Sequence, residues 1–354
     1  MKNKSLIIIL IITLILVTIS CGEKTTEIES YNFGVILDSL RYSTIQEAID
    51  EAVDGDTIFL TQGIFADAGD KNLNWDGNEK HLTIKLHQEA DYAIIECNGK
   101  GNGFIFNCTH QNTSDVIDGI TIRNCEKCDS ENEIGYAGIY CEDVAVTIKN
   151  CIIKDCGWCG IYCDNADPII ENCEIFDNKD GIMADNESSP LIKLNIIREN
   201  ELDGVFVSGD SYPSIINNLI VHNKRGIYCL YGRAWMVNNT IADNEVWGIN
   251  YINSDSSEVI NCIIWDNGKG FQTADINIVV SYSCAQDSFA SVNPDTLGNI
   301  YDDPLFVFPG TNYHLPSISP CINEGDNDAV YWDVDLDDEQ RINNEVVDMG
   351  VYEW

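Results

Sequence analysis

Basic residues are scarce in this chain. Of its 354 residues, 20 are Lys or Arg and 58 are Asp or Glu, which gives a formal net charge of −38 at pH 7. A surface this acidic repels phosphate backbones and anionic lipid headgroups. The composition therefore excludes nucleic acid as a partner. It favours partners that are neutral, basic or bridged by calcium.

Long apolar runs are also missing, apart from one near the amino terminus. There, MKNKS is followed by LIIILIITLILVTIS and then by Cys21. The run from Leu6 to Ile19 is short for a membrane-spanning helix, and the basic start before it is typical of an export signal. The Cys after Ser20 makes the segment resemble a bacterial lipoprotein signal, although Thr18 stands where such signals usually carry Leu. An ordinary cleaved signal and an uncleaved anchor are the alternatives.

The resemblance to a lipoprotein signal implies that Cys21 is lipidated. We therefore expect residues 1–20 to be a signal peptide and residues 21–32 to be a polar tether. It also implies an exported protein that is anchored by its lipid at the outer membrane or the cell surface.

From residue 150 onward the chain repeats with a period of about 22 residues. Six segments begin at Asn150, Asn172, Leu194, Asn217, Asn238 and Asn261, and Gly recurs at positions 160, 181, 204, 226, 248 and 270. Within each segment, short apolar runs alternate with Asn, Asp and Gly, which is typical of strands and turns. Because a unit this short does not close its own core, the pattern predicts a solenoid of stacked coils.

Asparagine is frequent at two aligned positions of the repeat. One column reads Cys151, Cys173, Asn195, Asn218, Asn239 and Cys262, and the other reads Cys156, Asn178, Asn200, Asn223, Asn244 and Asn267. If coils stack about 4.8 Å apart, an inward amide can hydrogen-bond to the amide of the next coil. We therefore expect ladders in which these buried polar groups satisfy one another.

Three stretches make the chain resemble the right-handed parallel β-helix of the pectin-lyase-like superfamily. They are STIQEAIDEAVDGDTIFLTQGIF (residues 43–65), which is similar to an amino-terminal helix cap, then LTIK, AIIECNGKGNGFIF and VIDGITIRNC as early coils, and the repeats above. The resemblance implies an all-β solenoid of about nine to ten coils over residues 33–285. It says little about activity, because one fold carries many functions.

Residues 286–354 differ from the repeats. They resemble a tail that follows β-helices in many secreted or surface-anchored bacterial proteins, through Asp335, Leu336, Asp337, Arg341, Asp348, Gly350, Tyr352 and Glu353. Asp338 stands where such tails usually have Gly. Because an open solenoid end is an exposed sheet edge, we interpret the tail as a C-terminal cap.

The chain has 15 cysteines, of which 14 remain when Cys21 is set aside. Two CxxC pairs, a spacing that elsewhere suggests zinc, are Cys125 with Cys128 and Cys156 with Cys159. Cys125 and Cys156 align with the second ladder column, which favours buried thiols. Disulfides and a metal site stay open as alternatives. Two pairs on adjacent coils lie within disulfide reach: Cys141 with Cys163, and Cys151 with Cys173.

The position before the repeating Gly is the candidate site, because sites on β-helices lie where several coils align outward side chains. It holds Asp180, Asp203 and Arg225 on consecutive coils. Two carboxyls beside an Arg suit acid/base catalysis, since like charges raise one pKa while the Arg keeps the other group ionised. Trp158 and Trp247 lie nearby in the repeat and are suited to stacking on a sugar ring. Solvated turn residues are the plainer alternative.

The tail segment DNDAVYWDVDLDDEQ alternates acidic residues with others. Its carboxylates suit calcium, with Asp333, Asp335 and Asp337 as candidate ligands. The EF-hand spacing is missing, so a solvated acidic loop is the alternative. Calcium is the one cofactor that the sequence suggests.

Two functions are consistent with this sequence. The first is a non-catalytic, monomeric envelope protein that binds glycan or a surface protein along the solenoid, and the regular, motif-poor repeats favour it. The alternative is a polysaccharide lyase, glycoside hydrolase or epimerase, which the superfamily resemblance and the column of Asp180, Asp203 and Arg225 favour. The net charge repels a uronate polymer that calcium does not bridge, so a neutral glycan fits better.

The comparison with superfamily enzymes also weighs against catalysis. Polygalacturonases carry an Asn-Thr-Asp motif followed by an Asp-Asp pair and a His in successive coils, and residues 178–180 match the first motif only in part. Pectate lyases place a basic residue beside an acidic calcium site, and Arg225 is the one basic candidate beside the Asp column. The five histidines do not cluster within one repeat.

Overall fold

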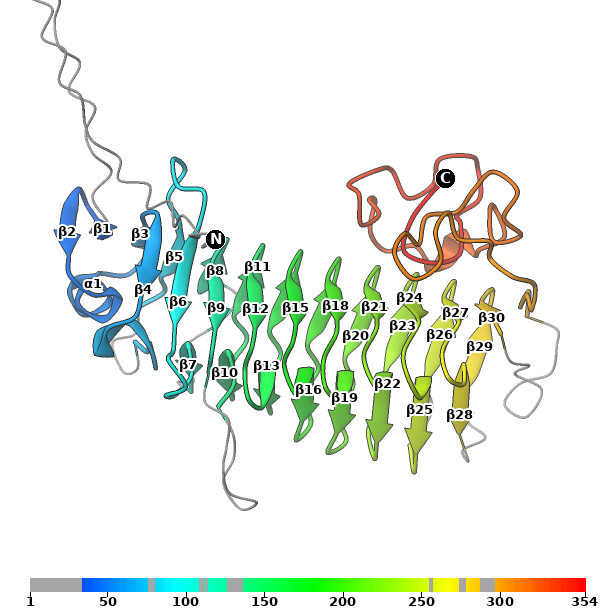
Figure 1. Ribbon diagram of the computed structural model, residues 1–354, viewed down its shortest axis with the longest axis horizontal. Helices are drawn as coiled ribbons and strands as arrows, with labels where there is room; N and C mark the ends of the chain where they lie inside the picture. Colours follow the sequence, from blue (N-terminus) through cyan, green and yellow to red (C-terminus); the bar gives the residue numbers. More distant parts are fainter. Residues whose placement is uncertain are drawn as a thin grey trace, which may run out of the picture. The chain divides into compact units, whose positions relative to one another are not determined.

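Each repeat folds into three short strands, and each strand pairs with its counterpart in the next coil (Figure 1). The computed structural model describes residues 34–75, 80–107, 112, 114–125, 136–254, 257–273, 278–286 and 297–354. Over these residues the chain forms a parallel β-solenoid of about nine turns, as expected. Cys21, with the predicted signal peptide and tether, lies outside the described residues.

Three sheets run along the solenoid. Sheet A contains β2 (Leu40–Tyr42), β1 (Val35–Leu37), β3 (Thr57–Leu60), β5 (Thr83–Leu86), β8 (Val116–Asp118), β11 (Thr147–Lys149), β14 (Ile169–Glu171), β17 (Leu191–Lys193), β20 (Ser214–Ile216), β23 (Trp235–Val237), β26 (Glu258–Ile260) and β29 (Val279–Ser281). Sheet B contains β4 (Gly63–Phe65), β6 (Ala93–Glu96), β9 (Thr121–Arg123), β12 (Ile152–Lys154), β15 (Glu174–Phe176), β18 (Ile196–Arg198), β21 (Leu219–Val221), β24 (Thr240–Ala242), β27 (Ile263–Trp265) and β30 (Cys284–Ala285). Sheet C contains β7 (Phe104–Phe106), β10 (Ile139–Glu142), β13 (Cys159–Asp164), β16 (Asp180–Asp185), β19 (Asp203–Ser208), β22 (Arg225–Leu230), β25 (Trp247–Ile252) and β28 (Phe271–Thr273).

The core is a stack of β-branched side chains. In sheet A the middle residue of each strand points inward and is fully buried, as in Ile148, Ile170, Ile192 and Ile215. The residues on either side of it are more exposed in most coils. This alternation is what a sheet that is packed on one face requires.

The predicted amide ladder is confirmed. Nδ2 of Asn178 donates to Oδ1 of Asn200 at 3.2 Å, Asn200 donates to Asn223 at 2.9 Å, and the pattern continues through Asn244 to Asn267. A second ladder joins Asn195, Asn218 and Asn239 in the same way. Every amide in these two sets is buried, so each rung satisfies polar groups of its neighbours that water does not reach.

Other Asn and Asp residues make the corners between strands. At the corner between sheets A and B, the φ values lie between 53° and 55° for Asn150, Asn172, Asn217, Asn238 and Asn261. Asn tolerates this left-handed conformation better than most residues do. The abundance of Asn thus has two causes, which are the interior ladders and the corners.

The amino-terminal end is covered by a helix, as expected. Helix α1 (Ile45–Glu51) begins after Thr44, whose side chain accepts from the backbone N–H of Glu47. Its apolar face buries Ile45 and Ile49 completely, and both belong to the same core cluster as the first coils. Strand β1 pairs antiparallel with β2 and β3, and a 3₁₀ helix, η1 (Ala68–Asp70), follows β4.

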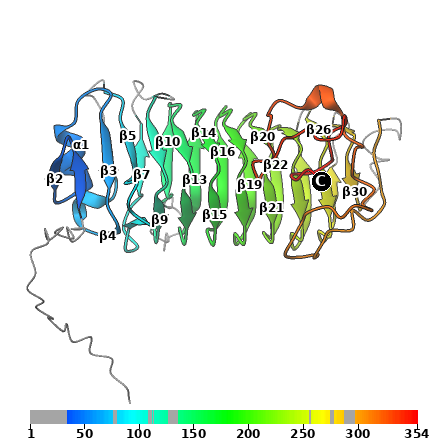
Figure 2. The same ribbon diagram turned by 90° about the horizontal axis from the view of Figure 1, so that it is seen from above.

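The tail extends the solenoid and then folds back along its side. The N–H of Ile300 donates to the carbonyl of Ser283, and Ile300 forms a parallel bridge with Cys284, so this part continues the last coil. Later tail residues pack outside sheets A and B (Figures 1 and 2). Val351 and Met349 contact the outer side of sheet B, and the 3₁₀ helix η2 (Asn327–Ala329) lies over sheet A. The cap interpretation therefore holds for a short segment, whereas most of the tail is a lateral cover.

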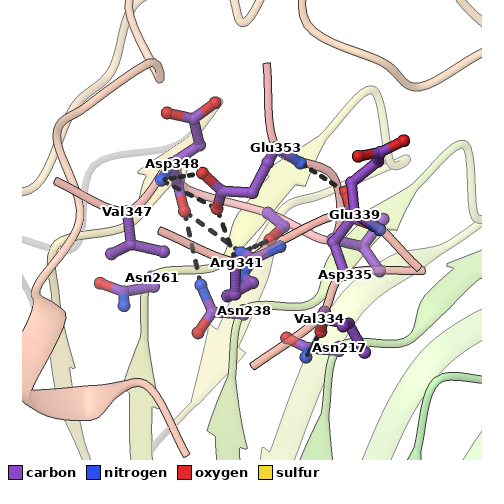
Figure 3. A network of polar contacts seen from close by, with 12 residues as sticks. Asn217, Asn238, Asn261, Val334, Asp335, Glu339, Arg341, Val347, Asp348 and Glu353 are labelled. Atoms are coloured by element: carbon purple, nitrogen blue, oxygen red, sulfur yellow. Dashed lines mark hydrogen bonds and ion pairs between the residues drawn. The ribbon is translucent and has the colours of Figure 1, made fainter. Parts of the chain in front are cut away.

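A polar network attaches the tail to the corner asparagines (Figure 3). The side-chain amide nitrogen of each asparagine donates to a backbone carbonyl of the tail. The pairs are Asn217 with Val334 at 3.1 Å, Asn238 with Asp348 at 3.4 Å, and Asn261 with Asp326 at 3.0 Å. Three successive coils therefore present the same side chain to the tail.

Within the tail, Arg341 is the centre of the network. It is almost fully buried, and its Nη2 donates to the carbonyls of Asp348 and Gly350. Its Nε lies 3.3 Å from Oε1 of Glu353, which is an ion pair without the angle of a hydrogen bond. Burial raises the pKa of Glu353 to about 8.

No helix among the described residues is long and apolar enough to cross a membrane.

Candidate functional site

The structure brings Asp180, Asp203 and Arg225 together on consecutive strands of sheet C. The backbone N–H of Asp203 donates to Oδ1 of Asp180 at 3.0 Å. Arg225 is bidentate on Asp203: Nη2 donates to Oδ2 at 2.8 Å, and Nε donates to Oδ1. Parallel pairing places Asp203 beside Arg225, and Arg225 beside Trp247.

The repeating Gly lies where successive coils approach each other closely. A Cβ on Gly204 would lie 2.7 Å from Cγ2 of Ile220 and 2.7 Å from the Gly226 carbonyl oxygen, both closer than real contacts allow. The Gly position therefore faces the interior against the next coil. Asp203, the residue before it, is itself buried and contacts the partly exposed Arg225, whose guanidinium lies over the half-buried Tyr228 ring.

Both carboxyls are nevertheless shielded from water. The exposed fraction is 6% for Asp180 and 2% for Asp203. Burial raises the pKa of Asp203 to about 7, although the hydrogen bonds and charge of Arg225 act in the opposite direction. Burial also raises the pKa of Asp180, which the N–H of Asp203 partly offsets. Because Arg225 occupies both oxygens of Asp203, this carboxyl has no free face for a substrate.

A second outward column lies beside the first, and sequence analysis missed it. Register pairs Tyr140 with Tyr162, Tyr162 with Met183, Met183 with Phe206, and Phe206 with Tyr228. We call these five residues the aromatic ladder. Each one stands two positions after the repeating Gly, so the signal was present in the aligned repeats.

The rings of the aromatic ladder contact one another in two pairs, with Met183 between them. Ring centroids are 5.4 Å apart for Tyr140 and Tyr162, and 5.3 Å apart for Phe206 and Tyr228, which are stacked. Tyr162 is buried, and the other four are half-buried, so the ladder is partly accessible along its length. It is an apolar strip with a small number of polar atoms.

The predicted tryptophans lie at the two ends of the acidic column. The ring of Trp158 packs against Tyr162 at 4.5 Å, and so joins the aromatic ladder. Trp247 is the rung after Arg225, and its indole N–H is buried without a hydrogen-bond partner among the described residues. Arg225 itself lies 4.1 Å from the centroid of the Tyr228 ring. The acidic column and the aromatic ladder are therefore one continuous surface.

Carboxylates lie on both sides of the ladder. On one side, Glu142, Asp164 and Asp185 form a register column. On the other side, a shallow depression of about 270 Å³ is lined by Lys179 and by the carboxylates of Asp155, Asp177 and Glu201, among other residues. Carboxylates along this face disfavour an anionic ligand.

The predicted calcium ligands do not converge. The buried carboxylate of Asp335 accepts the backbone N–H groups of Asp337, Glu339 and Glu353, and Asp337 pairs with His314 at 2.6 Å. Asp333 is exposed. Among the described residues, no group of three or more His, Cys, Asp or Glu side chains is placed to hold a metal ion. Asp335 stabilises a turn within this acidic alternation, and calcium binding by this segment stays a prediction.

The predicted cysteine pairs are neighbours, but they are not bonded. Cys141 and Cys163 are register partners in sheet C, and all four cysteines of the two pairs are buried, free thiols. Cys151 and Cys173 each donate to the carbonyl two residues earlier in the chain, at 3.1 and 3.3 Å. The interpretation as buried thiols describes the structure, and Cys128 lies outside the described residues.

Three stacked sheets with parallel pairing throughout the coils define a right-handed parallel β-helix with an open, columned face. The family described as "Right handed beta helix region" matches residues 93–237 and 202–291, which together are more than half of the chain. The chain belongs to this family. No curated protein matches the sequence.

Solved structures show the same fold. Pectate lyase Pel9A has a TM-score of 0.68 at 14% identity, over 88% of this chain and 91% of the lyase. XylC, in its complex with xylose, has a TM-score of 0.55 at 10% identity, over 88% of this chain and 95% of XylC. The AlgE6 A-module, an Azotobacter vinelandii mannuronan C-5 epimerase, has a TM-score of 0.32 at 15% identity, over 69% and 94%. For Pel9A and XylC, identities this low indicate the fold and leave activity to be argued from the residues.

Proposed function

We propose that this protein binds a neutral polysaccharide along the outer face of sheet C. The observation that carries the proposal is the aromatic ladder, which places five large side chains in register on successive coils. The coil rise of about 4.8 Å is close to the length of one sugar unit in an extended polymer. A repeating surface of this kind suits a repeating ligand.

The chemistry of the face supports a sugar. Half-buried aromatic rings offer apolar edges for sugar C–H groups, and the phenol oxygens of Tyr140 and Tyr228 offer hydrogen bonds. The column of Glu142, Asp164 and Asp185 offers acceptors for sugar hydroxyls. With a net charge of −38, these carboxylates favour a neutral chain over a uronate chain.

The tail leaves this face open. Its apolar contacts are with strands of sheets A and B, such as those around Val221 and Val237. In Figure 1 the tail lies on the side away from β22 and β25. Sheet C therefore remains accessible along the coils that carry the aromatic ladder.

Binding without catalysis is the better supported reading of the acidic column. A general acid or base must reach a substrate proton within hydrogen-bond distance. Both oxygens of Asp203 accept hydrogen bonds from Arg225. Asp180 is buried and accepts the backbone N–H of Asp203 on the next coil. In this proposal, Asp180 and Asp203 stabilise the strands of sheet C beneath the face on which the polymer lies.

One observation favours the enzymatic alternative, a polysaccharide lyase, hydrolase or epimerase. The pKa of Asp203 is raised to about 7, which is where a catalytic carboxyl titrates usefully. If this column is catalytic, Asp203→Asn abolishes the release of reducing ends or unsaturated products. If it is not, neither the wild type nor the variant releases product.

We also propose that the chain is exported and held at the outer membrane or cell surface by a lipid on Cys21. The basic start, the apolar run and the Cys after Ser20 support this proposal. Metabolic labelling with a radioactive fatty acid, compared with Cys21→Ala, tests it. Label that persists in the variant contradicts the assignment.

The binding experiment uses purified residues 22–354 on immobilised neutral and acidic polysaccharides, with and without calcium. We expect retention on a neutral polymer, and at least a tenfold weaker affinity for a Tyr140→Ala, Tyr228→Ala double variant. Tyr92→Ala is the matched control, because Tyr92 is 42% exposed and lies outside the aromatic ladder. Equal retention of the wild type and the double variant contradicts the proposal, provided that their circular dichroism spectra agree.

A further inference from the structure

Three buried thiols follow one another at the start of the longer amide ladder. Cys97, Cys125 and Cys156 lie on successive coils, and Asn178 continues the column. The exposed fractions of the three thiol-bearing residues are 0%, 3% and 2%. The first two differ from the third in where their sulfur atoms point.

Cys125 is directed at a sulfur atom. Its Sγ lies 3.3 Å from Sγ of Cys97. Cys156 instead donates to the carbonyl of Lys154 at 3.4 Å, and Cys262 similarly donates to the carbonyl two residues earlier. Most of these interior cysteines thus satisfy a carbonyl. Cys97 and Cys125 face each other, and Cys125 also contacts the Cys156 thiol, whose own hydrogen goes to the Lys154 carbonyl.

The backbone around this pair is already placed for a covalent link. Strands β6 and β9 pair in parallel, with Glu96 beside Arg123, and the N–H of Cys97 donates to the carbonyl of Arg123 at 3.0 Å. Neighbouring strands lie about 4.8 Å apart, within the Cα separation of about 4.4–6.8 Å that disulfides span. Small side-chain rotations are enough to bring the two sulfur atoms to bonding distance.

A small reagent can approach Cys125 from outside. The depression of about 270 Å³ beside the acidic column is lined by Cys125, Cys156 and Gly157. Cys97 is not part of that lining and is fully buried. Of Cys97 and Cys125, Cys125 is therefore the thiol that an oxidant meets first.

We propose that Cys97 and Cys125 are a disulfide site that ties together two coils near the amino-terminal end of the solenoid. The oxidant is a low-molecular-weight disulfide. The thiolate of Cys125 attacks one of its sulfur atoms and releases one thiol, and the thiolate of Cys97 then attacks the mixed disulfide and releases the second. The two cysteines lose two protons and two electrons, and the oxidant is reduced to two thiols.

The proposal implies when the bond forms. Burial and the neighbouring thiols raise the pKa of Cys125 well above its usual range, which lowers the thiolate fraction in the folded state. Oxidation is therefore faster while the coil is still open than after it has closed. An oxidising compartment, in which exported proteins fold, provides that condition.

Peptide mapping of the full chain tests the site. The reduced, unfolded chain is refolded with oxidised glutathione, free thiols are alkylated in denaturant, and the chain is cleaved with trypsin. Cleavage after Lys100, Arg123 and Lys127 places Cys97 and Cys125 in separate short peptides. We expect these two peptides to be joined, with a mass lower by two hydrogen atoms than their sum, and to separate on reduction.

Two variants sharpen the result. Cys125→Ser must abolish the joined species, and Cys141→Ser, which removes a buried thiol elsewhere in the core, must retain it. Complete alkylation of Cys97 and Cys125 in the refolded wild type overturns the proposal. A link between Cys125 and Cys156 in place of Cys97 also overturns it. Both outcomes are read from the wild type, so they do not depend on whether a variant folds.

Discussion

Asn200 lies in the middle of the longer amide ladder, and its replacement by Ala tests what holds the coils together. Its Nδ2 donates to the Ile175 carbonyl and to Oδ1 of Asn223, at 3.3 and 2.9 Å. Its Oδ1 accepts from the backbone N–H and from Nδ2 of Asn178, at 3.1 and 3.2 Å. One side chain therefore serves the coil before it and the coil after it.

Asn200→Ala removes hydrogen bonds from several partners, and these partners are not affected equally. After Asn200→Ala, Nδ2 of Asn178 still reaches the Ile153 carbonyl, and Oδ1 of Asn223 still receives the N–H of residue 200. The buried backbone N–H of Asn178 has no such second acceptor. An unpaired buried donor costs about 1–3 kcal/mol and each of the other three lost bonds about 1 kcal/mol, so we expect a destabilisation of roughly 4–6 kcal/mol.

Denaturant unfolding, followed by circular dichroism, measures this change in the free energy of unfolding. Glu201→Ala is the matched control, because Glu201 is exposed, and we expect it to change stability by less than about 0.5 kcal/mol. The double variant Asn178→Ala, Asn200→Ala should be less destabilised than the sum of the single variants, by about 0.5–3 kcal/mol. Simple additivity of these neighbours, or a cost below about 1 kcal/mol for Asn200→Ala, refutes the ladder argument.

Three further predictions concern the Gly column, the buried carboxyl and the tail. Gly204→Ala places a Cβ 2.7 Å from the Gly226 carbonyl oxygen, and we expect a loss of about 1–3 kcal/mol in denaturant unfolding, because this backbone atom and the buried Ile220 side chain resist adjustment. The pKa of Asp203 rises from 3.8 to about 7 on folding, so stability should fall as pH rises through this range, and Asp203→Asn should flatten that slope in thermal melts. Arg341→Met leaves Glu353 without its buried cation and should cost about 3–5 kcal/mol. Limited proteolysis should then cleave the tail before the coils, and cleavage at the wild-type rate would contradict this role.

The fold could be predicted from sequence because every coil repeats the same local requirements. A Gly where the interior has no room for a Cβ, an Asn where an amide completes a ladder, and Asn or Asp at corners recur with one period. Six copies turn weak local preferences into a clear pattern. The departures are informative too, because Leu194 and His222 adopt the corner conformation without being Asn or Asp.

The position of the tail could not be predicted in this way. Its attachment joins Asn217 with Val334 and Asn238 with Asp348, contacts between residues more than 100 positions apart. The sequence also left the role of Asp335 open, because oxygen atoms that accept backbone N–H groups and oxygen atoms that bind calcium come from the same residue types. Three-dimensional placement separates the two cases.

The candidate site was partly predictable, for a related reason. Alignment of the repeats places Asp203 next to Arg225, and the structure shows that they touch. Alignment does not reveal that Arg225 donates to both oxygens of Asp203, and this contact is why we propose a supporting role for the column. The aromatic ladder could have been found from the same alignment, since Tyr162, Phe206 and Tyr228 all follow the repeating Gly by two positions.

The two sides of each strand have different roles, and this difference explains why the proposed binding face is on sheet C. The inward columns hold the coils together, so they tolerate little change, whereas the outward columns are constrained only where something covers them. The tail covers outward residues of sheets A and B, including Ile216 and Leu219. On sheet C, where such a cover is absent over the described residues of the aromatic ladder, large side chains persist over five consecutive strands, four of them aromatic and the fifth Met183. Exposed apolar surface is costly for a soluble fold, so its retention on the open face is best explained by a ligand that covers it.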